Sequence, residues 1–509
     1  MHLDVVKNTK RNIFYGFFNR GVTLVLPFAT RTIIINRLGA DYLGLDGLFS
    51  SILQVLNLTE LGFGTAIVYS MYKPVANNDT KMMCALLAMY KKIYRVIGII
   101  ILAVGMLILP FLPYLIKGEH PDNVNIYILY IIYLINTVLG YMLFAYKSSI
   151  LNAFQRDDII SKVNIVSKFF LYTFQSIVVL LFSNYYIYLI ILPLSTMANN
   201  ILLSIIVRKE FPEYICSGNV DSKTKSDIKI RVAGLMISRL CMVSRNAFDN
   251  IFISAFWGLT LAAIYNNYFY IISSITSLMQ IISTALMGGI GNHVTINDVD
   301  KNMEEMLRLN YIYMLLGGWC SICLCFLFQP FMKLWMGEDY LFPMKSVSLF
   351  VIYFYSLKIG DTISIYINAT GLWWKTRYRS VLEAVSNIIL NYILGKRFGV
   401  NGVIIATIMT IIVFNFLWGS KIVFDNYFGK KNYKMYIFNH LKYALSTICV
   451  GGITYLVVNM FHGGAMFELL IRGAVCCIIS PLLYVLIYRN TNIYKITKQW
   501  VFSKICIKR

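Results

Sequence analysis

Long apolar segments dominate this chain and decide what it can fold into. A membrane-spanning helix needs about 20 mainly apolar residues, and fourteen segments of the 509-residue sequence meet that requirement. Turn residues separate them, as in Leu38-Gly39-Ala40-Asp41. Only 14% of the residues are charged, against about 25% in an ordinary soluble domain. The sequence therefore predicts an all-α integral membrane protein with about fourteen transmembrane helices.

The predicted spans are residues 13–38, 43–72, 90–116, 125–150, 159–183, 185–207, 231–257, 259–291, 309–335, 342–370, 379–397, 400–424, 437–461 and 466–488. The connections between them are short. The longest, at about 208–230, leaves no room for a soluble catalytic domain. Whatever this chain does, we expect it to do between its helices.

The basic residues predict the orientation of the chain. If the N-terminus is cytoplasmic, 34 of the 46 Lys and Arg residues lie in cytoplasmic segments and only 5 lie in outer segments. Such an excess on the cytoplasmic side is typical of membrane proteins. We therefore expect both termini to be cytoplasmic. The same excess accounts for most of the net charge of +22, so that no nucleic-acid partner is expected.

A weak internal repeat predicts two lobes. Gly39 aligns with Gly258 at an offset of 219 residues, and Phe182 aligns with Phe398 at an offset of 216. Each repeat holds six spans, so both have the same orientation, an arrangement typical of transporters with parallel repeats. The predicted domains are an N-lobe (1–220, spans 1–6), a C-lobe (221–430, spans 7–12), and two additional helices with a basic cytoplasmic tail (431–509).

Arginines inside the predicted spans indicate the kind of ligand, because a charge in the membrane is costly and needs a reason. Arg20 and Arg31 lie in the first span of the N-lobe, and Arg239 and Arg245 lie in the first span of the C-lobe. Arg31 lies eleven positions after Arg20, an offset that returns to nearly the same helix face. Guanidinium groups there would bind the phosphates or carboxylates of an anionic substrate. The alternative interpretation is that these side chains reach the membrane surface.

Carboxylates inside the spans have two interpretations. Asp249 lies four residues after Arg245, a spacing that allows an ion pair. Glu60 lies in a glycine-containing stretch of the second span. Each is a candidate for coupling transport to H⁺ or Na⁺, or for a structural ion pair. Lys358 and Asp361, three residues apart, are expected to form a structural ion pair. We expect no metal site and no resident cofactor.

One span mixes tyrosine and asparagine in the run Tyr265-Asn266-Asn267-Tyr268-Phe269-Tyr270. Aromatic rings and amides can stack on sugars and hydrogen-bond to them. Asn266, Asn267 and Tyr268 are therefore candidate glycan contacts. The alternative is helix packing, with asparagine amides linking neighbouring helices.

Short motifs give the chain a resemblance to a known family. They are Arg37-Leu38-Gly39-Ala40-Asp41-Tyr42-Leu43-Gly44, Leu61-Gly62-Phe63-Gly64, Asn152-Ala153-Phe154-Gln155-Arg156, Asn368-Ala369-Thr370-Gly371-Leu372-Trp373-Trp374-Lys375-Thr376-Arg377-Tyr378-Arg379 and Phe398-Gly399-Val400-Asn401-Gly402. Together they cover about 12–430. The chain resembles the Wzx-type polysaccharide or O-antigen flippases of the multidrug/oligosaccharidyl-lipid/polysaccharide (MOP) exporter superfamily.

This resemblance implies a MATE-like MOP fold whose two six-helix lobes alternate between inward-open and outward-open forms. The implied substrate is an undecaprenyl-pyrophosphate-linked oligosaccharide repeat unit, moved across the bacterial cytoplasmic (inner) membrane for capsule, O-antigen or exopolysaccharide synthesis. The implied partners are that glycan, membrane lipid, and the polysaccharide polymerase and chain-length proteins. The protein would be a transporter and not an enzyme. Its last two helices would hold the lipid tail, and Arg20, Arg31, Arg239 and Arg245 would line a cationic cavity.

Three other functions remain open from the sequence. An ion-coupled multidrug exporter of the same fold would favour an acidic cavity for cationic drugs, whereas this chain offers arginines. A membrane glycan polymerase or ligase usually has a large outer loop, and the predicted outer loops are roughly a dozen residues long. A scaffold role in a glycan assembly complex is compatible with any of these.

Overall fold

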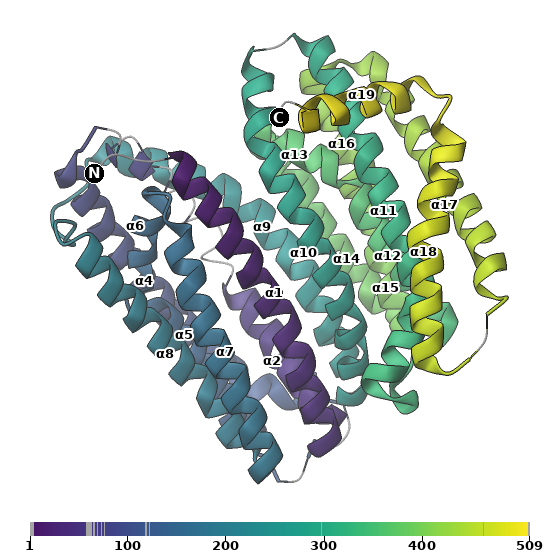
Figure 1. Cartoon of the computed structure of the whole chain (residues 1–509). Coiled ribbons are helices and arrows are strands. Elements are labelled where there is room, and N and C mark those ends of the chain that lie inside the picture. The colour runs from purple at the N-terminus through teal and green to yellow at the C-terminus, as the bar shows by residue number, and fades with distance from the viewer. Residues whose placement is uncertain are drawn as a thin grey trace. The chain divides into compact units, whose positions relative to one another are not determined.

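All regular secondary structure in the described part of the chain is helical (Figure 1). The computed structural model describes residues 5–57, 64, 67–68, 70–72, 74–75, 77–117, 120–121, 123–296, 298–461 and 463–506. For some helical residues, Arg239 among them, only the backbone is described. Glu60 lies outside the described residues. The all-α fold predicted from the sequence is confirmed.

The α-helices are α1 (Val5–Arg37), α2 (Ala40–Leu56), α4 (Thr80–Ile108), α5 (Ile126–Met142), α6 (Ser148–Ala153), α7 (Asp157–Phe182), α8 (Tyr185–Glu210), α9 (Ser222–Trp257), α10 (Leu259–Ile296), α11 (Val299–Met336), α12 (Met344–Ile359), α13 (Asp361–Thr370), α14 (Arg377–Phe398), α15 (Val400–Thr410), α16 (Gly419–Val423), α17 (Tyr433–Val458), α18 (Ala465–Tyr488) and α19 (Asn492–Cys506). Two π-helical segments, η6 (Ile411–Trp418) and η7 (Phe424–Phe428), lie on either side of α16. Short 3₁₀ turns are η2 (Leu109–Leu115), η3 (Ala145–Lys147), η4 (Glu338–Tyr340), η5 (Leu372–Trp374) and η8 (Lys430–Asn432).

Eight of the described helical segments are long and apolar enough to cross a membrane, and α5 with the bent segment after it adds a ninth. Helices α1 and α9 are also long but carry several arginines and lysines. The number of fourteen spans is compatible with these helices and stays a prediction.

Asparagine and aspartate side chains set where several helices begin. Asp79, Asn125, Asn184 and Asp221 each accept hydrogen bonds from backbone N–H groups in the first turn of the helix that follows. These groups have no partner within the helix, so the cap stabilises its start. Asp221 is exposed, and the bonds from Thr224 hold the pKa of its carboxyl below its usual range.

The ends of equivalent helices support the internal repeat. Gly39, between α1 and α2, has φ 109° and ψ 168°, and Gly258, between α9 and α10, has φ 93° and ψ 176°. Positive φ at these joints favours glycine, because it lacks a Cβ. Phe182 ends α7 and Phe398 ends α14. The residues aligned by the repeat therefore hold the same places in the two sets of helices.

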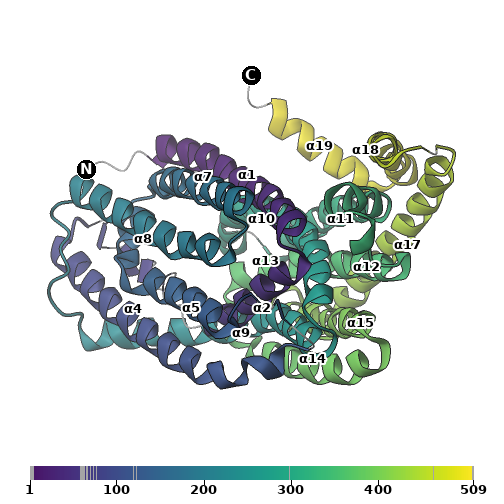
Figure 2. The same ribbon diagram turned by 90° about the horizontal axis from the view of Figure 1, so that it is seen from below.

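The chain divides into two compact units, Met1–Asn266 and Asn267–Arg509. In the first unit α1 lies along α7, which packs on α8, and α2 packs on α9 (Figures 1 and 2). In the second unit α11 packs against α12, α17 and α18. The lobes predicted at 1–220, 221–430 and 431–509 follow the repeat rather than these units, and they stay a prediction.

The two helices beyond the repeat belong to the core of the second unit. Buried side chains of α11, α17 and α18 form one apolar cluster, which includes Met314, Val450 and Cys476. The indole N–H of Trp319 donates to the backbone carbonyl of Cys476 at 3.0 Å. Between membrane helices, van der Waals packing and hydrogen bonds of this kind drive association, because lipid tails are as apolar as the packed side chains. Helices α17 and α18 are therefore held by packing and not by their connection alone.

Candidate functional site

Helix α1 carries two of the predicted cavity arginines, and the structure treats them differently. The side chain of Arg20 is exposed, whereas that of Arg31 is half-buried, with 18% of its surface accessible. A guanidinium on a membrane helix is strongly attracted to any nearby carboxylate. Arg31 has such a partner in the first unit, whereas Arg20 forms no ion pair with a described residue.

Asp46 on α2 is the partner of Arg31. The Arg31 Nη2 lies 4.0 Å from the Asp46 Oδ2, at the limit of an ion pair. The hydroxyl of Tyr133, on α5, donates a short hydrogen bond to Asp46. The hydroxyl of Tyr185, on α8, lies 3.5 Å from that of Tyr133 and donates to the backbone carbonyl of Tyr42. Four helices of the first unit thus meet at one carboxylate.

The Asp46 cluster is loosely closed on its cationic side. Asp46 keeps 26% of its side-chain surface accessible, and its separation from Arg31 is long for a charge-assisted hydrogen bond, which is about 2.7–2.9 Å. An anion that approached Arg31 would therefore compete with Asp46 for the guanidinium across a long contact and not a tight one. The sequence predicted a role in substrate binding for Arg31 but no such role for Asp46 or Tyr133. The helical periodicity of the sequence does not show which helices are neighbours.

Arg245 and Asp249, on α9, are both buried in the first unit, with 5% and 1% of their surfaces exposed. The hydroxyl of Tyr265 donates to the Asp249 Oδ2 at 3.4 Å. The backbone of Arg239 lies on the same helix, and its side chain is outside the described residues. Arg245 and Asp249 are thus surrounded by protein, as the cost of a charge in lipid requires.

Polar contacts join α9 to α2 and to the start of α10. Asn250 donates to the Ser51 hydroxyl at 3.0 Å, and Asn266 donates to the Asn250 Oδ1 at 2.9 Å. A Cβ on Gly47 would lie 2.0 Å from the Asn266 Nδ2, and one on Gly44 would lie 2.3 Å from a backbone oxygen of α10. Glycine at both positions permits this close approach. Helix α2 therefore contacts α1 through Asp46 and α9 through Ser51.

Tyr268 and Asn267 belong to the second unit and are buried. The Tyr268 hydroxyl donates to the Gln329 Oε1 at 3.0 Å and accepts the N–H of Phe342 at 3.2 Å. Its ring stacks on that of Phe350, with centroids 5.5 Å apart. These contacts are those of a packed side chain, while Asn266 serves the α2–α9 contact. The glycan contacts at Asn266, Asn267 and Tyr268 stay a prediction.

The ion pair expected between Lys358 and Asp361 is confirmed. The Lys358 Nζ lies 2.7 Å from the Asp361 Oδ2, across the break between α12 and α13. Lys358 is fully buried, with 1% of its side chain accessible. A buried charge of this kind is stable only when it is paired. The pair therefore holds the junction of the two helices.

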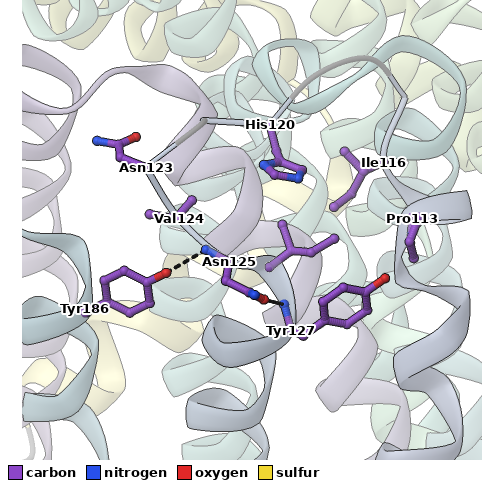
Figure 3. Close-up of a pocket in the computed structure, with 9 residues that line it drawn as sticks. Pro113, Ile116, His120, Asn123, Val124, Asn125, Tyr127 and Tyr186 are labelled. Atoms are coloured by element: carbon purple, nitrogen blue, oxygen red, sulfur yellow. Dashed lines mark hydrogen bonds between the residues drawn. The ribbon is translucent and has the colours of Figure 1, made fainter.

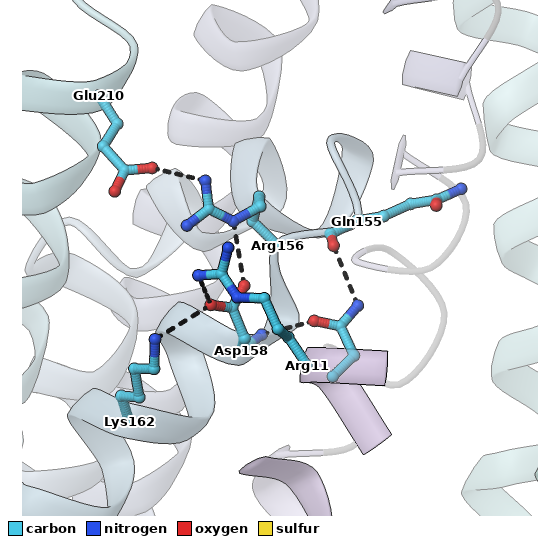
Figure 4. A network of polar contacts seen from close by, with 7 residues as sticks. Arg11, Gln155, Arg156, Asp158, Lys162 and Glu210 are labelled. Atoms are coloured by element: carbon cyan, nitrogen blue, oxygen red, sulfur yellow. Dashed lines mark hydrogen bonds and ion pairs between the residues drawn. The ribbon is translucent and has the colours of Figure 1, made fainter. Parts of the chain in front are cut away.

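A second ionic cluster, which the sequence did not predict, lies at the other end of α1 (Figure 4). Asp158 of α7 has no accessible surface and pairs with Arg11 at 2.5 Å, Arg156 at 3.0 Å and Lys162 at 3.3 Å. Arg156 also pairs with Glu210 at 3.0 Å. The spacing of four residues between Asp158 and Lys162 indicates an ion pair in the sequence. No sequence pattern indicates the contact of Asp158 with Arg11, which is 147 residues away. We call Arg11, Arg156, Asp158 and Lys162 the Asp158 clasp.

The first unit also has a pocket of about 560 Å³ beside the start of α5 (Figure 3). Its lining includes His120, Asn123, Asn125 and Tyr186. The backbone N–H of Asn125 donates to the Tyr186 hydroxyl at 2.6 Å. None of the predicted cavity arginines lines it. The pocket lies at the end of the helices predicted to face outward, and Asn123 in its lining accepts a hydrogen bond from the Tyr42 hydroxyl at 2.9 Å.

The comparison with protein families now decides where the chain belongs. The model of the polysaccharide biosynthesis protein family matches residues 9–287, more than half of the sequence. The chain belongs to this family. The match covers α1, α2 and α9, which carry Arg31, Asp46 and Arg245. None of the curated protein sequences matches the chain.

Solved structures of MOP-superfamily transporters share the fold of this family member. The lipid II flippase MurJ, in an inward closed conformation, has a TM-score of 0.66 at 18% identity, over 94% of this chain and 99% of that one. An inward-facing MATE multidrug transporter has a TM-score of 0.61 at 15% identity, over 78% and 94%. A MOP transporter from Pyrococcus furiosus, reported to have a binding pocket of reversed polarity, has 0.57 at 13%, over 82% and 95%. The MOP fold predicted from the sequence is thereby confirmed.

Proposed function

We propose that this protein is a flippase that moves an undecaprenyl-pyrophosphate-linked oligosaccharide repeat unit across the bacterial cytoplasmic membrane. It would act by alternating access of its two lobes, supply capsule, O-antigen or exopolysaccharide synthesis, and catalyse no covalent step. The family match supports a role in polysaccharide synthesis, and the fold supports a transporter. The single observation that carries the anionic substrate is Arg31, a half-buried guanidinium whose carboxylate partner is 4.0 Å away.

The physical task explains why such an arginine is useful. A pyrophosphate cannot cross hydrocarbon without compensation of its charge. The guanidinium of Arg31 can bind it in a bidentate manner, and Asp46 then remains held by Tyr133. In this proposal Arg245 adds a second buried cation, and Arg20 and Arg239 complete the cationic path. The polyprenyl tail stays in the lipid, where the outer surfaces of α17 and α18 would hold it.

Coupling to an ion belongs to the same proposal. Asp249 is a buried carboxylate that accepts a hydrogen bond from Tyr265, and it is our candidate for H⁺ or Na⁺ coupling together with Glu60. The partners we propose are the lipid-linked glycan, membrane lipid, and polymerase and chain-length proteins that consume the product. Both termini would be cytoplasmic, as the basic residues predict.

The test is to locate the lipid-linked glycan in cells depleted of this protein. Polyprenyl-linked glycans are extracted after treatment of spheroplasts with an impermeant glycan-modifying reagent. We expect unmodified glycan to accumulate on the cytoplasmic side, with loss of surface polysaccharide. Accumulation on the outer side would place the defect at a later step. No accumulation, with new sensitivity to cationic drugs, would overturn the proposal in favour of a multidrug exporter.

A further inference from the structure

One span of the second unit has an unusual winding. Between Val400 and Phe428 the helix passes twice into π geometry, in η6 and again in η7, with α16 between them. π turns are rare, and they occur frequently at functional sites. The span therefore contains two local distortions of the helix, and residues of both line the same groove.

The groove has a volume of about 420 Å³ and lies between this span and the start of α17. It is lined by Val413, Leu417, Trp418, Lys421, Ile422, Asp425, Asn426 and Tyr433. The Tyr433 hydroxyl donates to the backbone carbonyl of Leu417 at 3.1 Å and so joins α17 to η6. Every lining residue belongs to the second unit, and the groove is complete without any other part of the chain.

Two opposite charges line this groove without neutralising each other. Lys421 and Asp425 are both exposed, and neither makes an ion pair within 4.0 Å among the described residues. In a regular α-helix, a Lys and an Asp four residues apart would be neighbours. Here the winding changes from α16 to η7 between them. The groove thus offers a separate cation and a separate carboxylate.

The residues around these charges are of the kinds found at the level of lipid headgroups. Val413 and Leu417 expose 48% and 36% of their surfaces, which suits contact with acyl chains. Trp418 and Tyr433 are of the type that collects at membrane interfaces. The polar residues follow towards the end of the span that is predicted to be cytoplasmic. The Asn426 side chain accepts a hydrogen bond from the Lys375 ammonium and donates one to the backbone carbonyl of Ile422. These two bonds hold its amide in place at the edge of the groove.

We propose that this groove binds the headgroup of a zwitterionic aminophospholipid. The phosphate would lie against Lys421, the primary ammonium against Asp425, and one acyl chain along Val413 and Leu417. A zwitterion fits because it brings one charge of each sign to a groove that holds one of each. An anionic lipid without an amine would satisfy Lys421 but would place no cation at Asp425. This site does not rest on the proposed substrate of the flippase.

Native mass spectrometry of the purified full chain tests this assignment. Phosphatidylethanolamine and phosphatidylglycerol are titrated separately against the wild type, Asp425→Asn and Lys421→Ala. We expect the wild type to prefer phosphatidylethanolamine by about tenfold, the effect of one good charge-assisted contact. Asp425→Asn should remove this preference, and Lys421→Ala should weaken the binding of both lipids. Both side chains are exposed, so the variants should keep the fold, which a thermal unfolding curve checks.

Lys442→Ala is the matched control, because Lys442 is an exposed lysine of α17 that rests on Phe438, outside the groove. It should leave the binding of both lipids unchanged. An equal loss in this variant would show unspecific attraction of lipid to basic residues and would overturn the site. Equal affinity of the wild type for the two lipids, unaffected by Asp425→Asn, would overturn it in favour of an anionic-lipid site.

Discussion

The two ends of α1 are held in different ways. Near its start, Arg11 joins Asp158, a fully buried carboxylate that also pairs with Arg156 and Lys162. Twenty residues later, which is about 30 Å along a helix, Arg31 faces the partly accessible Asp46 at 4.0 Å. One carboxylate has three cations at close range, and the other has one cation at the limit of contact. The first carboxylate is enclosed by its cations, whereas the second stays partly accessible beside its arginine.

The two carboxylates differ in what their ion pairs contribute to stability. Breaking the ion pairs of a buried carboxylate strongly destabilises the folded protein, so the contacts of the Asp158 clasp are costly to break. The Arg31–Asp46 contact, at 4.0 Å and with both side chains partly accessible, contributes little, about 0–1 kcal/mol, so a substrate that replaces this contact loses little. We therefore assign stability to the Asp158 clasp and transport to Arg31. Substitutions at five positions test that division, and the largest effect is expected at Arg31.

Arg31→Ala should lower transport about a hundredfold, as loss of a desolvated charge–charge contact costs several kcal/mol. Membrane insertion and thermal stability should stay close to wild type, because the contact with Asp46 is weak. Arg245→Ala should lower transport to a similar extent. Arg31→Lys separates charge from bidentate recognition, and we expect partial activity. Surface polysaccharide in complemented cells measures transport. If both alanine variants transport normally, the cationic-cavity mechanism is wrong.

Asp158→Asn should destabilise the protein by about 2 kcal/mol. The cost of breaking a buried ion pair is about 3–5 kcal/mol, but the three cations are 16–40% accessible, so water recovers part of it. The midpoint of thermal unfolding in detergent measures the change. The protein that remains folded should transport normally per molecule. Wild-type stability together with lost transport would contradict the structural role of the Asp158 clasp.

Tyr133→Phe should have a moderate effect on transport, about fivefold. The substitution removes the hydrogen bond to Asp46 and keeps the ring, and a hydrogen bond to a charged group is worth about 1.5 kcal/mol or more. Asp46, freed from Tyr133, should hold Arg31 more tightly and compete with the substrate. Initial rates at several substrate concentrations should show weaker apparent binding. Unchanged rates would mean that Asp46 does not control Arg31.

Arg472→Ala should have the smallest effect. Arg472 pairs with Glu468 on the same helix at 2.8 Å, and both are partly accessible, so the loss of stability should be about 0.5 kcal/mol. It matches Arg31→Ala as the removal of one arginine from a membrane helix. Transport should remain near wild type. A loss as large as that of Arg31→Ala would show that arginine in a span matters regardless of place.

The sequence was sufficient for the fold class because long apolar segments and short polar joints leave few alternatives. The repeat was readable because glycine at 39 and 258 and phenylalanine at 182 and 398 end equivalent helices. Local pairs such as Lys358–Asp361 were readable as well, since helical spacing alone brings them together. These features depend on residues close in the chain or on one repeated pattern.

Contacts between distant segments were not readable. Asp46 and Tyr133 are 87 residues apart, and Arg11 and Asp158 are 147 apart. A period of 3.6 residues shows which face of a helix is polar but not which helix faces it. The same limit applies to Tyr268, which the sequence places next to two asparagines. The sequence could not show that its hydroxyl donates to Gln329 and accepts from a backbone N–H.

A flipping measurement in proteoliposomes tests most directly whether the protein moves the lipid-linked glycan by means of Arg31. The purified protein is reconstituted with a polyprenyl-pyrophosphate-linked oligosaccharide in both leaflets, and an impermeant glycan-modifying enzyme is added outside. We predict that wild-type vesicles expose nearly all of the glycan with time, whereas Arg31→Ala vesicles stop at the fraction of the outer leaflet. Wild-type vesicles that contain folded protein but also stop at that fraction would contradict the account.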